Sequence, residues 1–227
     1  MPEETPRTLN HFALFSFKDA YWGLPTPARA DLHQAWLAGL RDAAPAVQVY
    51  QSAESAVDLI VWSAVALGGP DTTARFFECH ARANNLVRPY LAPVHSLWGY
   101  TQPSQYTKTR STQEIDPFDP ERRRYLVIYP FVKTTEWYLL GREARQGMMN
   151  EHIRIGKQYE DISQLLLYSF GVQDQEFVVV YEMDDLPRFS DLVNELRGAD
   201  GRRYTLRDTP LHTGLYHPAE ETLALWA

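Results

Sequence analysis

The sequence of 227 residues contains a single cysteine, Cys79. One cysteine excludes an intramolecular disulfide and a zinc site built from several thiolates, and it is typical of a reducing compartment. No apolar run reaches the about 18 residues that a membrane-spanning helix needs, and residues 1–10 are too polar for a signal peptide. These absences predict a cytoplasmic protein with no segment inserted in a membrane.

Basic residues are fewer than acidic residues. Lys and Arg number 22 against 29 Asp and Glu, which gives a formal net charge of -7. Negative charge repels the phosphates of nucleic acids and of anionic membranes, so neither is favoured as a partner. Glycine-rich phosphate loops, Gly-x-Ser-x-Gly elbows and His-Glu-x-x-His metal motifs are also missing, which argues against the enzyme classes that they mark.

Aromatic residues are abundant, in contrast, at 13% of the chain with 6 Trp and 13 Tyr. The hydrophobic fraction of 44% and the charged fraction of 22% are those of an ordinary globular protein. The aromatic surplus therefore indicates a thick core, a flat apolar ligand, or both.

Hydrophobic periodicity predicts the same order of elements twice. Strand-like and helix-like segments alternate as β-α-β-β-α-β, the ferredoxin-like order, in each half. The first set is strand 11–17, helix 30–43, strands 46–50 and 56–67, helix 71–86 and strand 95–101. The second set is strand 124–132, helix 136–159, strands 162–169 and 176–183, helix 189–196 and strand 203–215.

This pattern predicts an α+β protein with halves at 1–101 and 124–227, joined by a polar linker or flap at 102–123. Each ferredoxin-like sheet leaves one apolar face uncovered, which the two repeats can bury by packing sheet on sheet or by merging into a barrel. We expect a dimeric α+β barrel-type unit with helices outside. An aromatic barrel interior would suit a large flat ligand.

Seven histidines are scattered along the chain, and His152 is the most informative. On the predicted helix it shares a face with Met148, Met149 and Ile155. A histidine on an apolar face is more often a core residue than a ligand. The alternative is axial ligation of a haem iron, which uses one neutral imidazole in an apolar pocket.

Two further groups of residues allow a structural and a functional interpretation. Tyr129 and Lys133 are four apart on a strand and point to one face, either as core and solvent-reaching side chains or as a phenol and a cation that face a ligand. Tyr106, Lys108 and Arg110 lie in the flap, where they form either a solvated loop or a grip on carboxylates.

Several motifs in combination carry a family resemblance. They are Tyr-Pro-x-x-Lys at 129–133 with Glu-Trp-Tyr at 136–138, Met-Met-Asn-Glu-His-Ile-Arg-Ile-Gly-Lys at 148–157, and Tyr-Ser-Phe-Gly-Val-Gln-Asp-Gln-Glu-Phe-Val-Val at 168–179. Together with the segments 106–110 and 204–210, they resemble the chlorite dismutase-like haem protein family. The resemblance covers residues 100–215 and implies a haem protein that assembles as a homopentamer.

Two positions distinguish activities within this family. Chlorite-degrading members carry an arginine over the haem where this sequence has Gln164, whereas members that decarboxylate coproheme are similar to it at Gln164, Tyr129 and Lys133. The resemblance therefore implies an enzyme of haem biosynthesis that uses hydrogen peroxide to remove two propionate carboxyls from coproheme and yield haem b. A chlorite-degrading or peroxidase activity, and a non-enzymatic haem or coproheme carrier, remain open.

The resemblance also implies a role for each site residue. His152 binds the iron, Tyr129 forms a radical that takes hydrogen from a propionate β-carbon, and Lys133 holds a carboxylate or supplies a proton. Asp200 is a candidate acceptor for the ring N–H of His152. The residues expected to contact the porphyrin are Tyr106, Lys108, Arg110, Trp137 and Met149.

Overall fold

The computed structural model describes residues 6–107 and 111–227. Its strands are β1 Thr8–Phe17, β2 Ala46–Ser52, β3 Leu59–Ala66, β4 Leu91–Thr101, β5 Tyr125–Lys133, β6 Ser163–Tyr168, β7 Phe177–Met183, β8 Thr205–Arg207 and β9 His212–Tyr216. Its helices are α1 Asp19–Trp22, α2 Thr26–Ala43, α3 Thr72–Val87, α4 Thr135–Leu139, α5 Arg142–Gly156, α6 Leu186–Arg197 and α7 Ala219–Ala224, with a 3-10 helix at Asp200–Tyr204. Within the described ranges, no helix has the length and apolarity to span a membrane.

Strands β1 to β7 and β9 close into one antiparallel barrel. The first half orders its strands β4-β1-β3-β2 and the second half orders them β6-β7-β5-β9, which is the ferredoxin-like order in both. Pairings β2–β9 and β4–β6 join the halves, while β8 pairs with the end of β5. The predicted merger of two ferredoxin-like repeats into an α+β barrel is confirmed.

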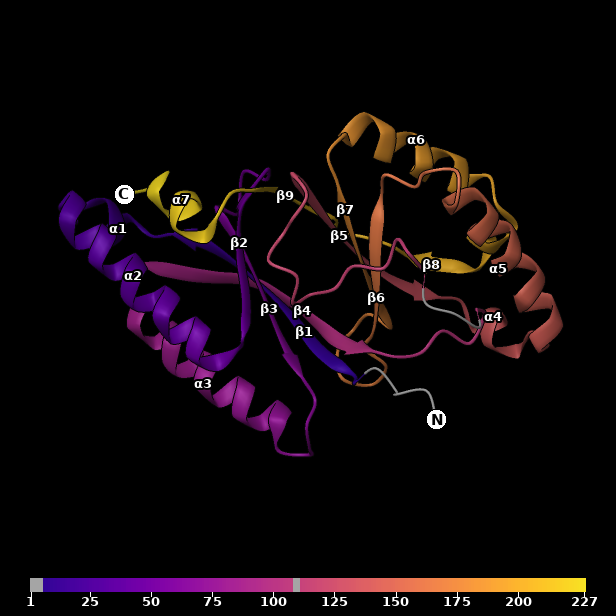
Figure 1. Cartoon of the computed structure of the whole chain (residues 1–227), viewed down its shortest axis with the longest axis horizontal. Helices are drawn as coiled ribbons and strands as arrows, with labels where there is room; N and C mark the ends of the chain where they lie inside the picture. Colours follow the sequence, from indigo (N-terminus) through magenta and orange to yellow (C-terminus); the bar gives the residue numbers. More distant parts are fainter. Residues whose placement is uncertain (1–5, 108–110) are drawn as a thin grey trace.

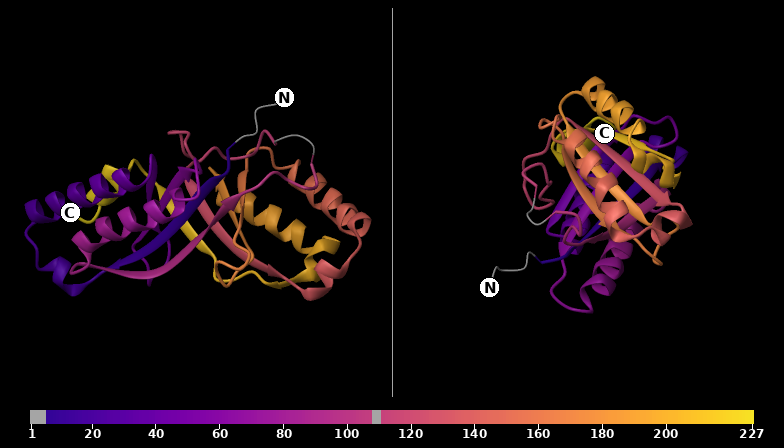
Figure 2. Two further views of the ribbon diagram at one scale, coloured as in Figure 1. Left: turned by 90° about the horizontal axis from the view of Figure 1, so that it is seen from below. Right: turned by 90° about the vertical axis from the view of Figure 1, so that its right-hand side faces the viewer.

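The helices lie outside the strands at the two ends of the molecule. Helices α2 and α3 cover the first half, and α5 and α6 cover the second, with the strands between them (Figures 1 and 2). The barrel interior is filled by one cluster of buried side chains, among them Phe12, Tyr50, Trp62, Leu126, Leu167 and Val180. The expectation that the interior holds a flat ligand is therefore wrong.

Glycines allow the strands to approach closely where the two halves meet. A Cβ atom at Gly99 in β4 would lie 2.6 Å from Ser169 Oγ and 2.8 Å from the Tyr168 carbonyl oxygen. A Cβ atom at Gly214 in β9 would lie 2.8 Å from Tyr50 Cβ. These distances are shorter than van der Waals packing permits, so closure of the barrel requires glycine, which has no side chain, at both positions.

Two predicted elements differ from the structure. The helix expected at 136–159 is two helices, because Leu140 and Gly141 both adopt extended backbone angles between α4 and α5. The strand expected at 203–215 is divided into the 3-10 helix, β8 and β9, with a cis Thr209–Pro210 peptide between the two strands. Proline lacks the N–H that a ladder needs, so continuous pairing ends there.

Candidate functional site

The candidate site lies between the second-half sheet and α5. Alternation along β5 sends Leu126 and Ile128 into the barrel, while Tyr129, Phe131 and the other odd-numbered residues point to the outer face, toward the helices. On β7, the outward Val179 and Phe177 pair with Tyr129 and Phe131. Apolar side chains on both faces explain why the strand reads as an almost unbroken apolar run.

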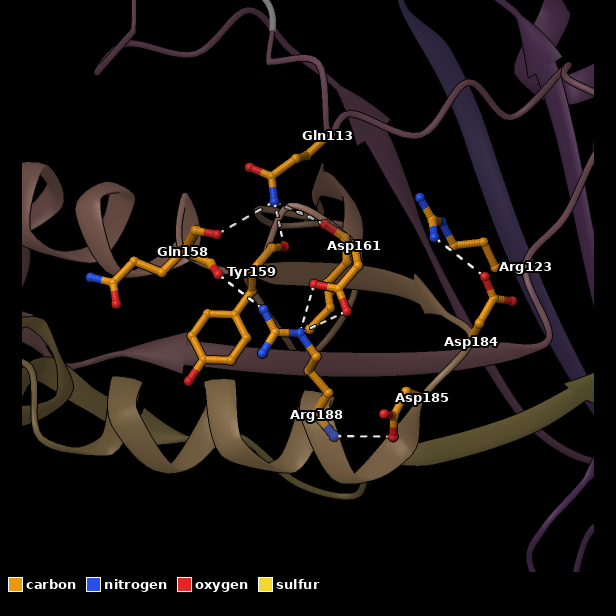
Figure 3. A network of polar contacts seen from close by, with 10 residues as sticks. Gln113, Arg123, Gln158, Tyr159, Asp161, Asp184, Asp185 and Arg188 are labelled. Carbon is orange, nitrogen blue, oxygen red and sulfur yellow. Dashed lines mark hydrogen bonds and ion pairs between the residues drawn. The ribbon is translucent and has the colours of Figure 1, made fainter.

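The linker holds both ends of α5. Gln146 Nε2 donates to the Tyr106 carbonyl oxygen at 3.2 Å near the start of the helix. At its end, Gln113 Nε2 donates to the carbonyl oxygens of Tyr159 at 2.8 Å and Ile162 at 3.0 Å (Figure 3). Because α5 ends at Gly156, the Gln113 bonds fix the turn that follows the helix.

Helix α6 also contacts the turn that follows α5. Arg188 Nε lies 2.8 Å from both carboxylate oxygens of Asp161, and its guanidinium lies 4.8 Å from the centre of the Tyr159 ring (Figure 3). At the start of α6, Asp185 accepts from the Arg188 backbone N–H and so caps the helix. The turn that follows α5 is therefore connected to both the linker and α6.

His152 lies on α5 and is half-buried. Burial, and then the positive charge of Lys133, lower the pKa of His152 below its usual value, against the opposing effect of Glu151. The ring is therefore neutral near pH 7, as an iron ligand requires. The described residues supply no hydrogen bond to either ring nitrogen. The suggested acceptor Asp200 instead lies 3.6 Å from Arg203 Nε.

Lys133 faces the same space from the end of β5. Its Nζ donates to the Gly201 carbonyl oxygen at 3.2 Å and lies 4.6 Å above the Trp137 ring. Burial lowers the pKa of Lys133 to about 8, helped by Arg202 and opposed by Glu176. A lysine of this kind exchanges protons near neutral pH more readily than an exposed one.

The other predicted site residues differ in burial and in their contacts with Lys133. Trp137 is 4% exposed and lies beneath the Lys133 ammonium, 5.8 Å from the ring of Tyr204. Met149 is half-buried on α5. Burial raises the pKa of Tyr106, with Arg145 acting in the opposite direction. Lys108 and Arg110 lie outside the described residues.

Gln164 lies on β6, two strands from Tyr129. Its partner across the ladder is Tyr181, whose side chain belongs to the cluster on the outer face, so the exposed Gln164 side chain points to that face too. Its backbone pairs with the linker, through Gln164 N–H to the Gln113 carbonyl oxygen at 2.8 Å. The site residues thus share one side of the sheet.

Three polar residues around Tyr129 were not foreseen from the sequence. The Tyr129 hydroxyl donates to Asp208 Oδ2 at 2.9 Å and accepts from Arg197 Nη2 at 2.6 Å. Arg197 and Arg202 each place an Nη1 atom 2.6 Å from the same Asp208 oxygen. Asp208 falls within the segment 204–210 that carries part of the resemblance, which was the one available signal.

The chemistry of this side of the molecule fits a haem. The neutral imidazole of His152, with no hydrogen-bond partner among the described residues, is the kind of group that ligates a haem iron. Apolar side chains on the same side remain open, with Leu166 of β6 37% exposed and Phe170 46% exposed. A flat apolar ligand would cover such surface, and the cations of Lys133 and the arginines suit its carboxylates.

Comparison with known proteins identifies the family of this chain. The chlorite dismutase family profile matches residues 30–217. A coproheme decarboxylase of Mycolicibacterium smegmatis is 33% identical over 132 residues, 58% of this chain and 56% of the relative. A Halobacterium salinarum protein that carries the provisional name of a heme-binding protein is 34% identical over 146 residues, 56% of this chain and 29% of the relative. Each alignment thus spans less than two thirds of the relative.

Solved structures match over almost the whole chain. A crystal structure that carries the provisional name of a chlorite dismutase has a TM-score of 0.81 at 26% identity and covers 96% of this chain and 99% of its own. A mutant chlorite dismutase of Candidatus Nitrospira defluvii has a TM-score of 0.81 at 23% identity, with 97% and 95% covered. With a profile match over most of its length, this chain belongs to the chlorite dismutase family.

Proposed function

We propose that this chain is a coproheme decarboxylase that acts in haem biosynthesis. It would bind coproheme as substrate and redox centre and use hydrogen peroxide to convert two propionates to vinyl groups. The observation that carries the proposal is that a neutral His152, to which no described residue donates or accepts a hydrogen bond, lies on the same side of the sheet as Tyr129 and Lys133 of β5. The similarity to the M. smegmatis enzyme supports it.

Each residue has a task in this proposal. His152 supplies the axial nitrogen, and the bound iron porphyrin supplies the oxidising chemistry once peroxide reaches it. Tyr129 gives up a hydrogen atom and takes one from a propionate β-carbon. Lys133, with a pKa of about 8, holds a carboxylate or donates a proton there.

The residues at the rim would select and orient the substrate. Tyr106, Lys108 and Arg110 would bind further propionates, and Trp137 and Met149 would lie beside the porphyrin. Gln164 provides an amide where chlorite-degrading relatives have an arginine, which favours decarboxylation over chlorite decomposition. By the same resemblance we propose a homopentamer, which light scattering coupled to gel filtration would test.

The decisive experiment adds coproheme to the purified protein and titrates peroxide. Mass spectrometry should record the loss of one and then of two carboxyl groups, with haem b as product. Tyr129→Phe should bind coproheme normally and leave its mass unchanged, whereas Tyr159→Phe, a control whose hydroxyl donates to Glu195, should react as wild type. An unchanged coproheme mass in the wild-type protein would refute the proposal.

Ligation of the iron by His152 is tested by a separate measurement. His152→Ala should lose or strongly shift the Soret band after gel filtration, and His217→Ala should not. Oxygen release from chlorite would favour a chlorite-degrading enzyme instead. A stable Soret band with no response to peroxide would favour a haem or coproheme carrier, in keeping with the provisional name of the H. salinarum relative.

A further inference from the structure

The hydroxyl of Tyr129 is connected to one nearly buried carboxylate. It donates to Asp208 Oδ2 at 2.9 Å, and Asp208 is 8% exposed. The other close partner of the hydroxyl, Arg197, is a donor and cannot accept a proton. Among the described residues, Asp208 is therefore the acceptor to which the phenol proton points.

Two arginines keep Asp208 charged and in place. Arg197 Nη1 and Arg202 Nη1 both lie 2.6 Å from Oδ2. Burial raises the pKa of Asp208, but the hydrogen bonds from Tyr129 and the two arginines outweigh it, so the pKa is lowered overall. Asp208 is thus a carboxylate at neutral pH, bound by three donors at a single oxygen.

The phenol, in contrast, stays protonated at rest. Burial and the hydrogen bond to Asp208 raise the pKa of Tyr129 to about 12. Spontaneous transfer from a phenol to a carboxylate of lowered pKa is therefore strongly unfavourable. Removal of an electron reverses this order, because an oxidised phenol is a strong acid and any carboxylate beside it becomes an adequate base.

We propose that Asp208 takes the proton of Tyr129 when Tyr129 is oxidised, and this inference rests on the proposed function. The O–H bond of Tyr129 breaks, its proton forms a new bond to Asp208 Oδ2, and one electron leaves to the oxidant that hydrogen peroxide generates in the site. Tyr129 becomes a neutral phenoxyl radical. A hydrogen atom from the propionate β-carbon then restores the phenol.

The balance of the whole reaction includes this proton. A propionate side chain that becomes a vinyl group and carbon dioxide loses two electrons and one proton, while peroxide takes up two electrons and two protons to become two waters. One of these two protons is the one that Asp208 accepts and then releases, and the other comes from the solvent. Asp208 therefore ends each round as a carboxylate. Arg197 and Arg202 act as positioning residues, because they hold the carboxylate oxygen against the hydroxyl.

The first test uses the apo-protein and involves no turnover. Asp208→Asn removes the negative charge, so the pKa of Tyr129 should fall, as measured by NMR of a ¹³Cζ-tyrosine label assigned with Tyr129→Phe. The chain offers a matched control in Glu195, which accepts from the Tyr159 hydroxyl at 3.0 Å. Glu195→Gln should shift Tyr159 and leave Tyr129 unchanged. An unaltered Tyr129 pKa in Asp208→Asn would overturn the inference.

The second test measures the radical. After coproheme-loaded protein is mixed with peroxide, freeze-quench EPR should detect a Tyr129 radical that forms at least about tenfold more slowly in Asp208→Asn, as expected when a positioned proton acceptor is lost. Asp208→Glu, which keeps a carboxylate, should recover part of the rate. In wild type, radical formation should slow in D₂O, a measurement that needs no variant.

The outcomes separate the two proposals. A Tyr129 radical that forms equally fast in wild type and in a folded Asp208→Asn protein overturns the role of Asp208 alone. A rate that is the same in H₂O and D₂O does so too. Failure to detect any Tyr129 radical in wild type overturns the proposed function together with this inference.

Discussion

Acid should destabilise this protein through a buried histidine of the first half. His11 lies on β1, is 4% exposed, and has the rings of Phe76 and His80 at 5.5 and 4.6 Å. No residue that the structure describes forms a hydrogen bond with its Nδ1 atom. Burial, and to a smaller extent repulsion by His80, lower the pKa of His11 from 6.5 to about 3. The folded state therefore resists protonation of this ring.

The loss of stability in acid follows from the difference between the pKa of His11 in the unfolded and in the folded state. In the unfolded chain the ring binds a proton near pH 6.5, so below that pH the unfolded state gains about 1.4 kcal/mol per pH unit over the folded state. Because the pKa is depressed by folding, the contribution of His11 is complete above pH 6.5 and is lost as the pH falls toward 3. Between pH 6.5 and 5 the loss is about 2 kcal/mol.

Urea unfolding at pH 7.5 and pH 5.0 measures this loss. His11→Leu should lose about 2 kcal/mol less than wild type between the two pH values, because the other titrating groups are common to both proteins. Phe76→Leu disturbs the same cluster without removing a titratable group and should keep the wild-type pH dependence. If His11→Leu and wild type lose the same free energy, the reasoning is refuted.

Two further predictions concern packing and the support of α5. Gly214→Ala, with its Cβ 2.8 Å from Tyr50 Cβ, should lower the free energy of unfolding by about 1–3 kcal/mol. Gly147→Ala in α5, where a Cβ would meet no described atom within 4 Å, should raise it by about 0.5–1 kcal/mol. Equal effects in thermal unfolding would contradict the close approach at the barrel closure. Gln113→Ala removes the amide that donates to the carbonyl oxygens of Tyr159 and Ile162, so amide hydrogen exchange at the end of α5 should accelerate by roughly fivefold, as the loss of about 1 kcal/mol predicts. Unchanged exchange would show that the linker does not support this turn.

Much of the secondary structure could be predicted because it depends on local patterns. The strand at 124–132 and the helix at 30–43 appear within a few residues of their expected bounds, since alternation and helical spacing report burial directly. The break between α4 and α5 was missed because a single glycine does not rule out a continuous helix. The division of the last strand was missed because β8 and β9 both pair with β5, which no local pattern reports.

The candidate site was predictable only where motifs carried it. His152, Tyr129 and Lys133 stand in recognisable segments, and the structure brings them to one side of the second-half sheet. Arg197 and Asp208 contact the Tyr129 hydroxyl across 68 and 79 residues of sequence. Because such contacts depend on how α6 and the end of β8 pack, no spacing along the chain indicates them.

Composition and periodicity by themselves determined the α+β class, the doubled element order and the kinds of side chain available for chemistry. Only the tertiary structure decided which sheet face is the interior. Strands such as β5 are apolar on both faces, so periodicity cannot tell the barrel interior from the surface beneath the helices. Much of the aromatic surplus, including Trp36, Trp62 and Tyr21, turned out to fill the core. The candidate site lies on the outer face of the second-half sheet, since packed side chains fill the barrel interior.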